Sequence, residues 1–256
     1  MENIFNVEGK IALITGSTGG LGLAFAEGLL DRGAIVVLNG RDQQKLDKVV
    51  ERLKEKSKSK NVYGFAFDVT DVNGIGNGVK SVIDLLGGID ILVNNAGINI
   101  RAPLHEFDDD DWDKVIGINL TGTYKVSKAV VPHMIKQKRG KIINIGSMQS
   151  ELGRPTIAPY AASKGGVKML TKGMAVDWAK HNIQANAIGP GYFKTDLTKS
   201  LYENPEFDAW LCSRTPSNRW GETSELLGAL IFLASDASNY VNGHMLYVDG
   251  GLLASV

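Results

Sequence analysis

The chain lacks several features that mark proteins for export or for a membrane. Its only cysteine is Cys212, so no intrachain disulfide can form and a reducing compartment is compatible with the sequence. No uninterrupted apolar run approaches the ~20 residues that are needed to cross a bilayer. The first residues carry no basic segment followed by an apolar core, as a signal peptide would. We therefore expect a cytoplasmic protein with no membrane partner.

An excess of charge of one sign is also missing. Lys+Arg and Asp+Glu both number 28 among 256 residues, which argues against a broad basic surface for nucleic acid or anionic lipid. A local basic pocket for a small anion stays compatible with this balance. Pro/Ser-rich linkers, internal repeats and low-complexity segments are absent as well, so we expect one domain over residues 1–256.

Short β-branched runs alternate along the chain with longer amphipathic stretches. Several runs are apolar without polar alternation, which is typical of a parallel sheet covered on both faces. The predicted strands are 11–15, 35–38, 62–67, 89–93, 141–145, 183–188 and 245–248. The predicted helices lie near 21–32, 42–56, 72–86, 111–137, 159–180 and 223–234. This alternation predicts an α/β fold with a doubly wound sheet and right-handed crossovers.

Two runs of charge have a structural interpretation. The lysines within residues 54–60 lie at the end of a predicted helix, where their positive charges interact favourably with the negative end of the helix dipole. The run Asp108–Asp111 precedes a long amphipathic stretch and indicates an N-terminal cap with first-turn carboxylates. We favour this cap over a metal site, so no metal ligand is predicted.

A glycine-rich turn, Thr15–Gly22, lies between the first predicted strand and the first predicted helix. Glycine lets the backbone approach a pyrophosphate, and the helix N-terminus offers free N–H groups. The turn differs from the common G-x-G-x-x-G fingerprint because Phe25 follows three positions after Gly22, and no Gly-Lys-Ser/Thr of a P-loop is present. We predict that a dinucleotide binds here, with contacts from Gly16, Ser17, Thr18, Gly20, Leu21 and Gly22.

The end of the second predicted strand favours NADP as the cofactor. NAD-selective sites place a carboxylate near this strand end to accept from the ribose 2′-hydroxyl. Here Asn39 is followed by Gly40 and Arg41, and an arginine can hold a 2′-phosphate instead. The alternative is that Arg41 is merely solvated. We therefore predict that Asn39 and Arg41 contact NADP, with NAD as the other possible cofactor.

Polar residues also follow the third and fourth predicted strands, at the edge where doubly wound folds bind ligands. Asp68 and Val69 follow the third strand, and Asp68 could accept from the adenine amino group. Asn94-Asn95-Ala96-Gly97 follows the fourth. The two asparagines could contact the cofactor, with Asn95, Ala96 and Gly97 as site residues, or could tie neighbouring strands together. The sequence leaves both roles open.

A tyrosine and a lysine four positions apart, Tyr160 and Lys164, lie one turn apart on the same face of a predicted helix. A free tyrosine titrates near ~10, and a cation ~4 Å away supplies roughly 4 kcal/mol, enough to lower that pKa by a few units. Ser147 follows a predicted strand and can hydrogen-bond a substrate oxygen. Asn119 either holds a water that relays protons from Lys164 or is an ordinary polar helix residue. This set predicts hydride transfer.

Taken in order, these motifs resemble the short-chain dehydrogenases/reductases over essentially the whole chain. The motifs are Thr15-Gly16-x-x-x-Gly20-x-Gly22, Asn94-Asn95-Ala96-Gly97, Asn119, Ser147, Tyr160-x-x-x-Lys164 and Pro190-Gly191. The resemblance implies a seven-stranded Rossmann sheet and a catalytic tetrad of Asn119, Ser147, Tyr160 and Lys164. It implies that Lys164 binds the nicotinamide ribose and that Pro190, Gly191, Phe193 and Thr195 line the nicotinamide. Members are usually homotetramers, so self-association as a tetramer or dimer is expected.

Two further segments, 147–155 and 210–221, resemble a gluconate-oxidising group of that family. This resemblance implies that the substrate is a small sugar acid, D-gluconate or 5-dehydro-D-gluconate, with a lid near 192–220. Such an acid needs a cation for its carboxylate, and Arg101 and Arg154 are candidates. Gln149 and Glu151 could hold hydroxyls. The alternative for all four is that they are solvated loop residues.

Three rival functions stay open. A related sugar-acid dehydrogenase of the 2-deoxygluconate type, or a 3-oxoacyl-carrier-protein reductase, would keep the chemistry and change the substrate. A nonenzymatic dinucleotide sensor on the same fold would typically lose the tyrosine or the lysine, and both are present here.

Overall fold

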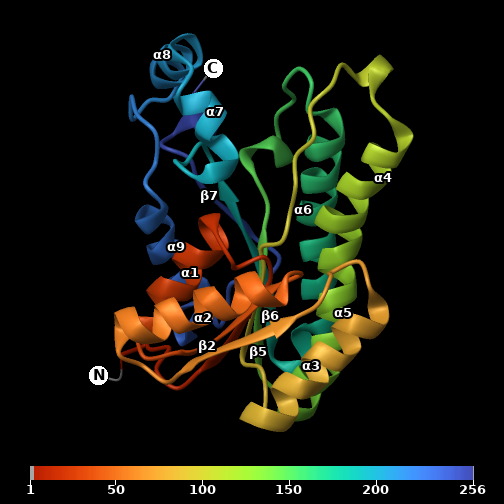
Figure 1. The fold of residues 1–256 in the computed structure, drawn as a ribbon, viewed down its shortest axis with the longest axis vertical. Helices are drawn as coiled ribbons and strands as arrows, with labels where there is room; N and C mark the ends of the chain where they lie inside the picture. The colour runs from red at the N-terminus through yellow and green to blue at the C-terminus, as the bar shows by residue number, and fades with distance from the viewer. Residues whose placement is uncertain (1–2, 256) are drawn as a thin grey trace.

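Within residues 3–255, which the computed structural model describes, seven parallel strands form one sheet in the order β3-β2-β1-β4-β5-β6-β7 (Figure 1). The first two residues and the last residue of the expected 1–256 domain lie outside the described residues. The strands are β1 (Ile11–Ile14), β2 (Ile35–Gly40), β3 (Val62–Ala66), β4 (Ile91–Asn94), β5 (Gly140–Ile145), β6 (Ile183–Pro190) and β7 (Met245–Val248). The predicted seven-stranded, doubly wound sheet is confirmed.

Helices cover both faces of this sheet. They are α1 (Gly20–Leu30), α2 (Gln43–Ser57), α3 (Val72–Leu86), α4 (Asp109–Ile116), α5 (Thr123–Gln137), α6 (Ala158–Trp178), α7 (Lys199–Tyr202), α8 (Pro205–Arg214) and α9 (Leu227–Ala234). Short 3₁₀ turns lie at Leu104–Glu106, Met148–Ser150, Ala179–His181, Asp196–Thr198, Thr223–Leu226, Asp236–Ser238 and Leu252–Ala254. One apolar core packs α1, α2 and α9 against the sheet, and the other packs α3, α5 and α6.

The apolar runs of the strands supply both cores at once. In β1, Ala12 and Ile14 belong to the core under α1, while Leu13 belongs to the core under α5. Successive side chains of a strand point to opposite faces, so a strand buried on both sides is apolar at every position. This requirement explains why these strands show no polar alternation.

The structure departs from the predicted helices in one place that matters for the site. The stretch predicted as one helix over 111–137 is interrupted by a π-helical turn, Gly117–Gly122, between α4 and α5. Such turns shift the backbone register by one residue, and this one carries Asn119. The predicted cap of this stretch is confirmed, because the Asp108 side chain accepts from the backbone N–H groups of Asp110 and Asp111.

Two features are absent from the residues that the structure describes. None of their helices is long and apolar enough to cross a membrane. No group of three or more His, Cys, Asp or Glu side chains in residues 3–255 is arranged to hold a metal ion.

The strand order places a ligand crevice beside β1. The chain runs outward from β1 through β2 to β3, then returns to β4 on the other side of β1. Doubly wound sheets bind ligands at such a reversal, outside the carboxyl ends of the strands. Between β6 and α9, residues 191–226 form a long connection that we call the excursion after β6. It contains α7 and α8, which lie together at the top of the view in Figure 1.

Candidate active site

A cavity of about 390 Å³ lies at the carboxyl ends of the strands, where the chain turns from β1 into α1 and leaves β2, β4, β5 and β6. Many of the site residues predicted from the sequence line it: Gly16, Thr18, Gly20, Leu21, Asn39, Arg41, Asp68, Val69, Asn95, Ala96, Gly97, Ser147, Tyr160, Lys164, Pro190, Gly191, Phe193 and Thr195. The fold thus brings together residues that lie far apart in the sequence.

Other predicted residues do not line this cavity: Ser17, Gly22, Arg101, Asn119, Gln149, Glu151 and Arg154. Conversely, the lining includes residues that sequence reasoning missed: Gly19, Gly40, Phe67, Ile98, Ile118, Ile145, Gly146, Leu197 and Thr198. These are mostly glycines and apolar side chains, which have no chemistry that a motif reveals. Their nearness to predicted residues in the chain is the one signal that could have found them.

The glycine-rich turn needs glycine at position 16. Gly16 has a φ of +62°, and a Cβ atom there would lie 2.8 Å from the Cα atom of Ala96. Behind the turn, the Ser17 hydroxyl donates to the Ile14 carbonyl at 2.8 Å and accepts from the Asn39 N–H at 2.9 Å. Ser17 therefore holds the ends of β1 and β2 together instead of facing the cavity. The turn is left as a bare backbone cradle of the kind that accommodates a pyrophosphate.

At the end of β2 the cavity offers a cation and no carboxylate. A Cβ atom on Gly40 would lie 2.7 Å from the Cγ2 atom of Thr18, so a side chain at this position would have to displace that of Thr18. Arg41 lies at the rim with an exposed guanidinium, 3.8 Å from the Asp68 carboxylate. Burial raises the pKa of Asp68, but hydrogen bonds from Thr70 and the charge of Arg41 outweigh it and lower that pKa. Asp68 is thus a carboxylate that can accept a hydrogen bond.

The two asparagines after β4 act as ties between elements. The Asn94 amide donates to the Ser127 hydroxyl at 2.8 Å and to the Asn144 side-chain oxygen at 2.9 Å. Asn95 donates to the carbonyl oxygens of Thr15 and Gly16, both at 3.0 Å. Asn95 also lines the cavity, whereas Asn94 does not. The structural role therefore holds for both, and contact with a ligand is open to Asn95 alone.

Ser147 and Tyr160 form the reactive end of the cavity. The Ser147 oxygen accepts from the Gln149 N–H at 3.1 Å, which leaves its own O–H to donate to the Tyr160 phenol beside it. Tyr160 stands in the first turn of α6 and keeps part of its surface open to the cavity. Removal of the phenol from bulk water raises the pKa of Tyr160, and the nearby Ser147 hydroxyl opposes that rise. The phenol is therefore protonated near neutral pH.

Lys164 is buried and points toward β5. Its ammonium donates to the carbonyl oxygen of Ile145 at 2.6 Å and lies 5.7 Å from the centre of the Tyr160 ring. Burial lowers the pKa of Lys164 to about 8. The sequence predicted that this lysine lowers the pKa of Tyr160, but the structure shows a raised pKa. Burial is the largest effect on that pKa, and the Lys164 ammonium bonds to a backbone carbonyl instead of the phenol.

Asn119 supports the cavity wall from behind. Its side-chain oxygen accepts from the Ile98 N–H at 2.8 Å, and its amide donates to the Ile98 carbonyl at 2.9 Å. The amide also reaches the Ser163 hydroxyl at 3.0 Å. A Cβ atom on Gly97 would lie 3.3 Å from the Asn119 oxygen and 3.7 Å from the Lys164 ammonium. Asn119 thus fixes the backbone next to Lys164, with its own polar atoms already paired.

Two arginines lie close together beside the reactive end. Burial is the largest cause that lowers the pKa of Arg101, and the charge of Arg154 lowers the same pKa further. Arg154 donates to the hydroxyl of Tyr192 at 3.2 Å. Neither arginine has a carboxylate within ion-pair distance in the part of the chain that the structure describes. Two neighbouring cations without a counter-charge form an anion-binding feature.

The other two predicted substrate contacts differ from each other. Glu151 is engaged by the Lys168 ammonium and by the Tyr247 hydroxyl, the latter at 2.6 Å. The hydrogen bond from Lys168 is the main cause that lowers the pKa of Glu151. Gln149 is buried, and its side-chain oxygen has no hydrogen-bond partner within residues 3–255. Gln149 therefore carries an unpaired acceptor in the protein interior, whereas Glu151 is already bonded within the protein.

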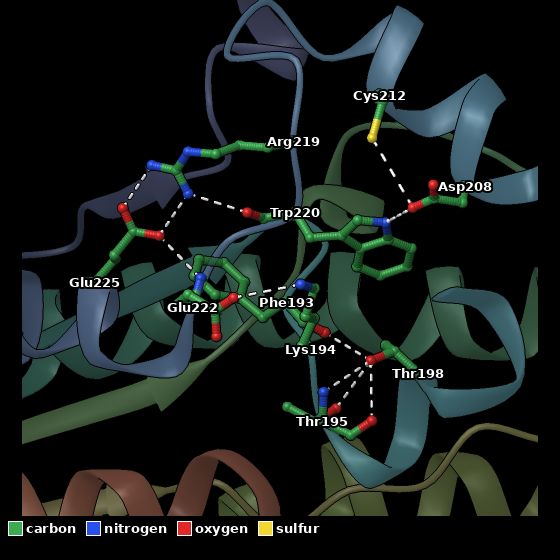
Figure 2. Close-up of polar contacts among 10 residues, drawn as sticks. All are labelled: Phe193, Lys194, Thr195, Thr198, Asp208, Cys212, Arg219, Trp220, Glu222 and Glu225. Atoms are coloured by element: carbon green, nitrogen blue, oxygen red, sulfur yellow. Dashed lines mark hydrogen bonds and ion pairs between the residues drawn. The ribbon is translucent and has the colours of Figure 1, made fainter. Parts of the chain in front are cut away.

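The excursion after β6 is closed at its base. The backbone of Phe193 pairs with that of Gly221, and the backbone N–H of Lys194 donates to the Gly221 carbonyl at 3.1 Å. Figure 2 shows the ion pair of Arg219 with Glu225, whose atoms lie 2.7 Å apart, and the contact of Lys194 with Glu222 at 3.5 Å. The two ends of the excursion are thus fastened to each other beside the cavity.

Comparison with known proteins agrees with this geometry. The family model described as "short chain dehydrogenase" matches residues 10–206. The chain belongs to the short-chain dehydrogenase family of oxidoreductases, as its motif order predicts.

Within that family it is similar to enzymes of sugar-acid metabolism. It is 50% identical to the 5-keto-D-gluconate 5-reductase of Escherichia coli, with 100% of both chains covered. It is 48% identical to the 2-dehydro-3-deoxy-D-gluconate 5-dehydrogenase of Formosa agariphila, over 99% of this chain and 96% of the relative. It superposes with a TM-score of 0.96 and 50% identity on a gluconate 5-dehydrogenase from Burkholderia cenocepacia in complex with NADP and tartrate, covering 99% of this chain and 98% of that one.

Proposed function

We propose that this chain is an NADP-dependent oxidoreductase that interconverts D-gluconate and 5-dehydro-D-gluconate. The observation that carries the proposal is the joint placement of Ser147, Tyr160 and Lys164 in one cavity with the glycine-rich turn. The full-length similarity to a 5-keto-D-gluconate 5-reductase supports the substrate. The segment 192–220 is the substrate lid of a single domain.

The cavity fits a dinucleotide with a 2′-phosphate. The φ of Gly16 suits the pyrophosphate cradle, and Gly19, Gly20 and Leu21 at the start of α1 line it, where the free N–H groups of a helix N-terminus can bind a phosphate. Arg41 holds the 2′-phosphate, and Asp68 accepts from the adenine amino group. The absence of a carboxylate at Gly40 disfavours NAD, whose free 2′-hydroxyl needs an acceptor. When bound, the nicotinamide supplies the hydride for reduction or accepts it in oxidation.

The side chains of the reactive end handle the proton. In reduction, Tyr160 donates a proton to the oxygen on carbon 5, and its raised pKa keeps it protonated for that role. The O–H of Ser147, which lies beside the phenol, donates to the same oxygen and stabilises it. Lys164, charged below about pH 8, restores the proton of Tyr160 and binds the nicotinamide ribose. Asn119 keeps the Gly97–Ile98 backbone in place beside Lys164.

The substrate carboxylate binds to Arg101 and Arg154. Their uncompensated charges lie close together, and a carboxylate between them would be bound by two guanidinium groups. Gln149 supplies an acceptor for a hydroxyl of the sugar chain. Glu151 acts instead through its bonds to Lys168 and Tyr247 in the wall.

A second candidate substrate is 2-dehydro-3-deoxy-D-gluconate, because the relative from Formosa agariphila is nearly as similar as the gluconate enzymes. Both acids are oxidised at carbon 5 and carry a carboxylate at carbon 1, so the same arginines and the same tyrosine serve them. They differ at carbons 2 and 3.

A 3-oxoacyl-carrier-protein reductase needs a basic patch for the carrier, and a nonenzymatic sensor has no use for an intact Ser147, Tyr160 and Lys164.

We propose that the enzyme works in the cytoplasm as a homotetramer or dimer. The single cysteine is compatible with a reducing compartment. The helices α5 and α6 expose apolar side chains, with Tyr124 at 46%, Met169 at 61% and Val176 at 80% exposure. Exposed apolar side chains gathered on helices suit burial against a second copy of the chain.

The deciding experiment is a substrate panel followed by NADPH absorbance. We expect NADPH oxidation with 5-dehydro-D-gluconate, much slower oxidation of NADH, and NADP reduction with D-gluconate. Faster NADP reduction with 2-dehydro-3-deoxy-D-gluconate would favour the second candidate. Turnover of a 3-oxoacyl thioester alone, or cofactor binding without turnover of any ketone, would refute the proposed function.

A further inference from the structure

The Arg154 guanidinium is held by two aromatic side chains of the excursion after β6. Its Nη1 atom donates to the Tyr192 hydroxyl at 3.2 Å, and its Cζ atom lies 4.6 Å from the centre of the Phe207 ring. A contact over a ring face orients the planar guanidinium and leaves its charge uncompensated, so its remaining N–H groups stay available to an anion. Arg154 is therefore fixed in orientation before any ligand binds.

Tyr192 links this arginine to the reacting centre. It lies close enough to raise the pKa of Tyr160 and to oppose the lowering of the pKa of Arg101. Its neighbours Gly191 and Phe193 line the cavity. The fixed guanidinium is thus bonded to a segment whose flanking residues line the cavity.

Phe207 is itself anchored to the far end of the excursion. Its neighbour on α8, Asp208, accepts from the Trp220 indole N–H at 2.7 Å, as Figure 2 shows. The Phe207 ring packs edge-on against Tyr192, with ring centres 5.7 Å apart, and lies 6.3 Å from the Trp220 ring. Trp220 is only 4% exposed. The ring over Arg154 is therefore held by the buried part of the excursion.

We propose that Phe207 is a positioning residue that sets the selectivity of this site for sugar acids over uncharged ketones, by holding Arg154 where the substrate carboxylate arrives. This inference rests on the proposed function and deepens it. A carboxylate at carbon 1 is far from the reacting carbon 5, so a correctly oriented cation at that distance also orients the substrate. Because the ring already restricts the guanidinium, less side-chain freedom is lost on binding.

The test compares KM values for an acid and a neutral ketone. Phe207→Leu removes the ring and keeps an apolar side chain, and we expect the KM for 5-dehydro-D-gluconate to rise about tenfold, as loss of a cation–π contact predicts. The kcat for that acid and the KM for 5-dehydro-D-fructose, which has a carbon 5 ketone and no carboxylate, should stay within about twofold. Phe207→Tyr keeps the ring and should restore the acid KM.

A matched control removes a different ring from the same cluster. Tyr202 on α7 packs against Trp220 at 5.9 Å, and we expect Tyr202→Leu to leave the acid KM unchanged. In a double-mutant cycle, Phe207→Leu should raise the acid KM little further once Arg154→Lys has removed the guanidinium, because the ring acts only by orienting that group. NADPH affinity and the melting temperature of each variant report whether the cavity stays intact.

The outcomes separate the inference from the proposed function. An equal rise in KM for acid and neutral ketone, or additive effects in the cycle, overturns the role of Phe207 while the proposed function stands. If the wild-type enzyme reduces 5-dehydro-D-fructose and 5-dehydro-D-gluconate with equal kcat/KM, the acid selectivity and the inference are both overturned.

Discussion

The Lys164 ammonium lies 5.7 Å from the centre of the Tyr160 ring, one helical turn along α6. The two side chains share a face of the helix, but the ammonium donates its hydrogen bond to the Ile145 carbonyl. Lys164 thus lies near the phenol without bonding to its oxygen, while burial raises the pKa of Tyr160 and keeps the phenol protonated. This arrangement suits a tyrosine that acts first as an acid.

Replacement of Tyr160 by phenylalanine removes the proposed proton donor and little else. We expect kcat to fall by roughly 10²–10⁴-fold, the usual contribution of a positioned acid or base. NADPH should still bind, because the cradle at Gly16 and the cation at Arg41 are unchanged. Steady-state kinetics and a fluorescence titration of NADPH measure both quantities. Near-normal turnover would contradict the role of Tyr160.

The two directions of the reaction should respond oppositely to pH. Reduction needs the protonated phenol and a charged Lys164, whose pKa is about 8, so its kcat/KM should fall as the pH rises through that value. Oxidation needs the phenol to lose its proton, and the raised pKa of Tyr160 means that kcat/KM should climb with pH. Profiles between about pH 6 and 10 test this. Lys164→Arg should remove the fall near pH 8, and parallel profiles in both directions would refute the assignment.

Arg41 should decide the choice of cofactor. Hydrogen bonds to charged groups contribute about 1.5–3 kcal/mol, so Arg41→Ala should raise the KM for NADPH by roughly 10–100-fold. The KM for NADH should stay nearly constant, because its ribose has no 2′-phosphate. Arg41→Lys serves as the control, since it keeps the charge and should lose less. A wild-type preference for NADH would show that Arg41 is only solvated.

Asn119 and Asn94 offer a matched pair of buried asparagines. Asn119→Ala leaves the polar backbone atoms of Ile98 unpaired, and Asn94→Ala breaks the bonds to Ser127 and Asn144. Each change should lower the free energy of unfolding by about 1–3 kcal/mol.

The two variants should differ in activity. Asn119→Ala should also lower kcat, because the Gly97–Ile98 backbone beside Lys164 loses its support. Asn94→Ala should leave the kcat of the folded enzyme unchanged, since the Asn94 side chain bonds to those of Ser127 on α5 and Asn144 on β5 and not to the backbone beside Lys164. Urea unfolding and kinetics of both variants provide the measurement, and equal losses of kcat would assign Asn119 a purely structural role.

Much of the fold could be predicted because its signals are local. The apolar runs gave each strand to within a few residues, and the helix α3 begins and ends where its pattern predicts. The π-helical turn at Gly117–Gly122 could not be predicted, since the sequence there continues a helical pattern. The helix α8 could not be predicted either, because its packing against Trp220 through Phe207 and Asp208 is a tertiary contact.

The sequence by itself determined the strands, the glycine-rich turn and the alignment of Tyr160 with Lys164, since each depends on neighbours within one strand, turn or helix. Only the tertiary structure decided which way Lys164 points and what holds Arg154. The bond of Lys164 to Ile145 spans 19 residues, and that of Arg154 to Tyr192 spans 38. Such contacts depend on how separate elements pack, and no local pattern of residues encodes that packing.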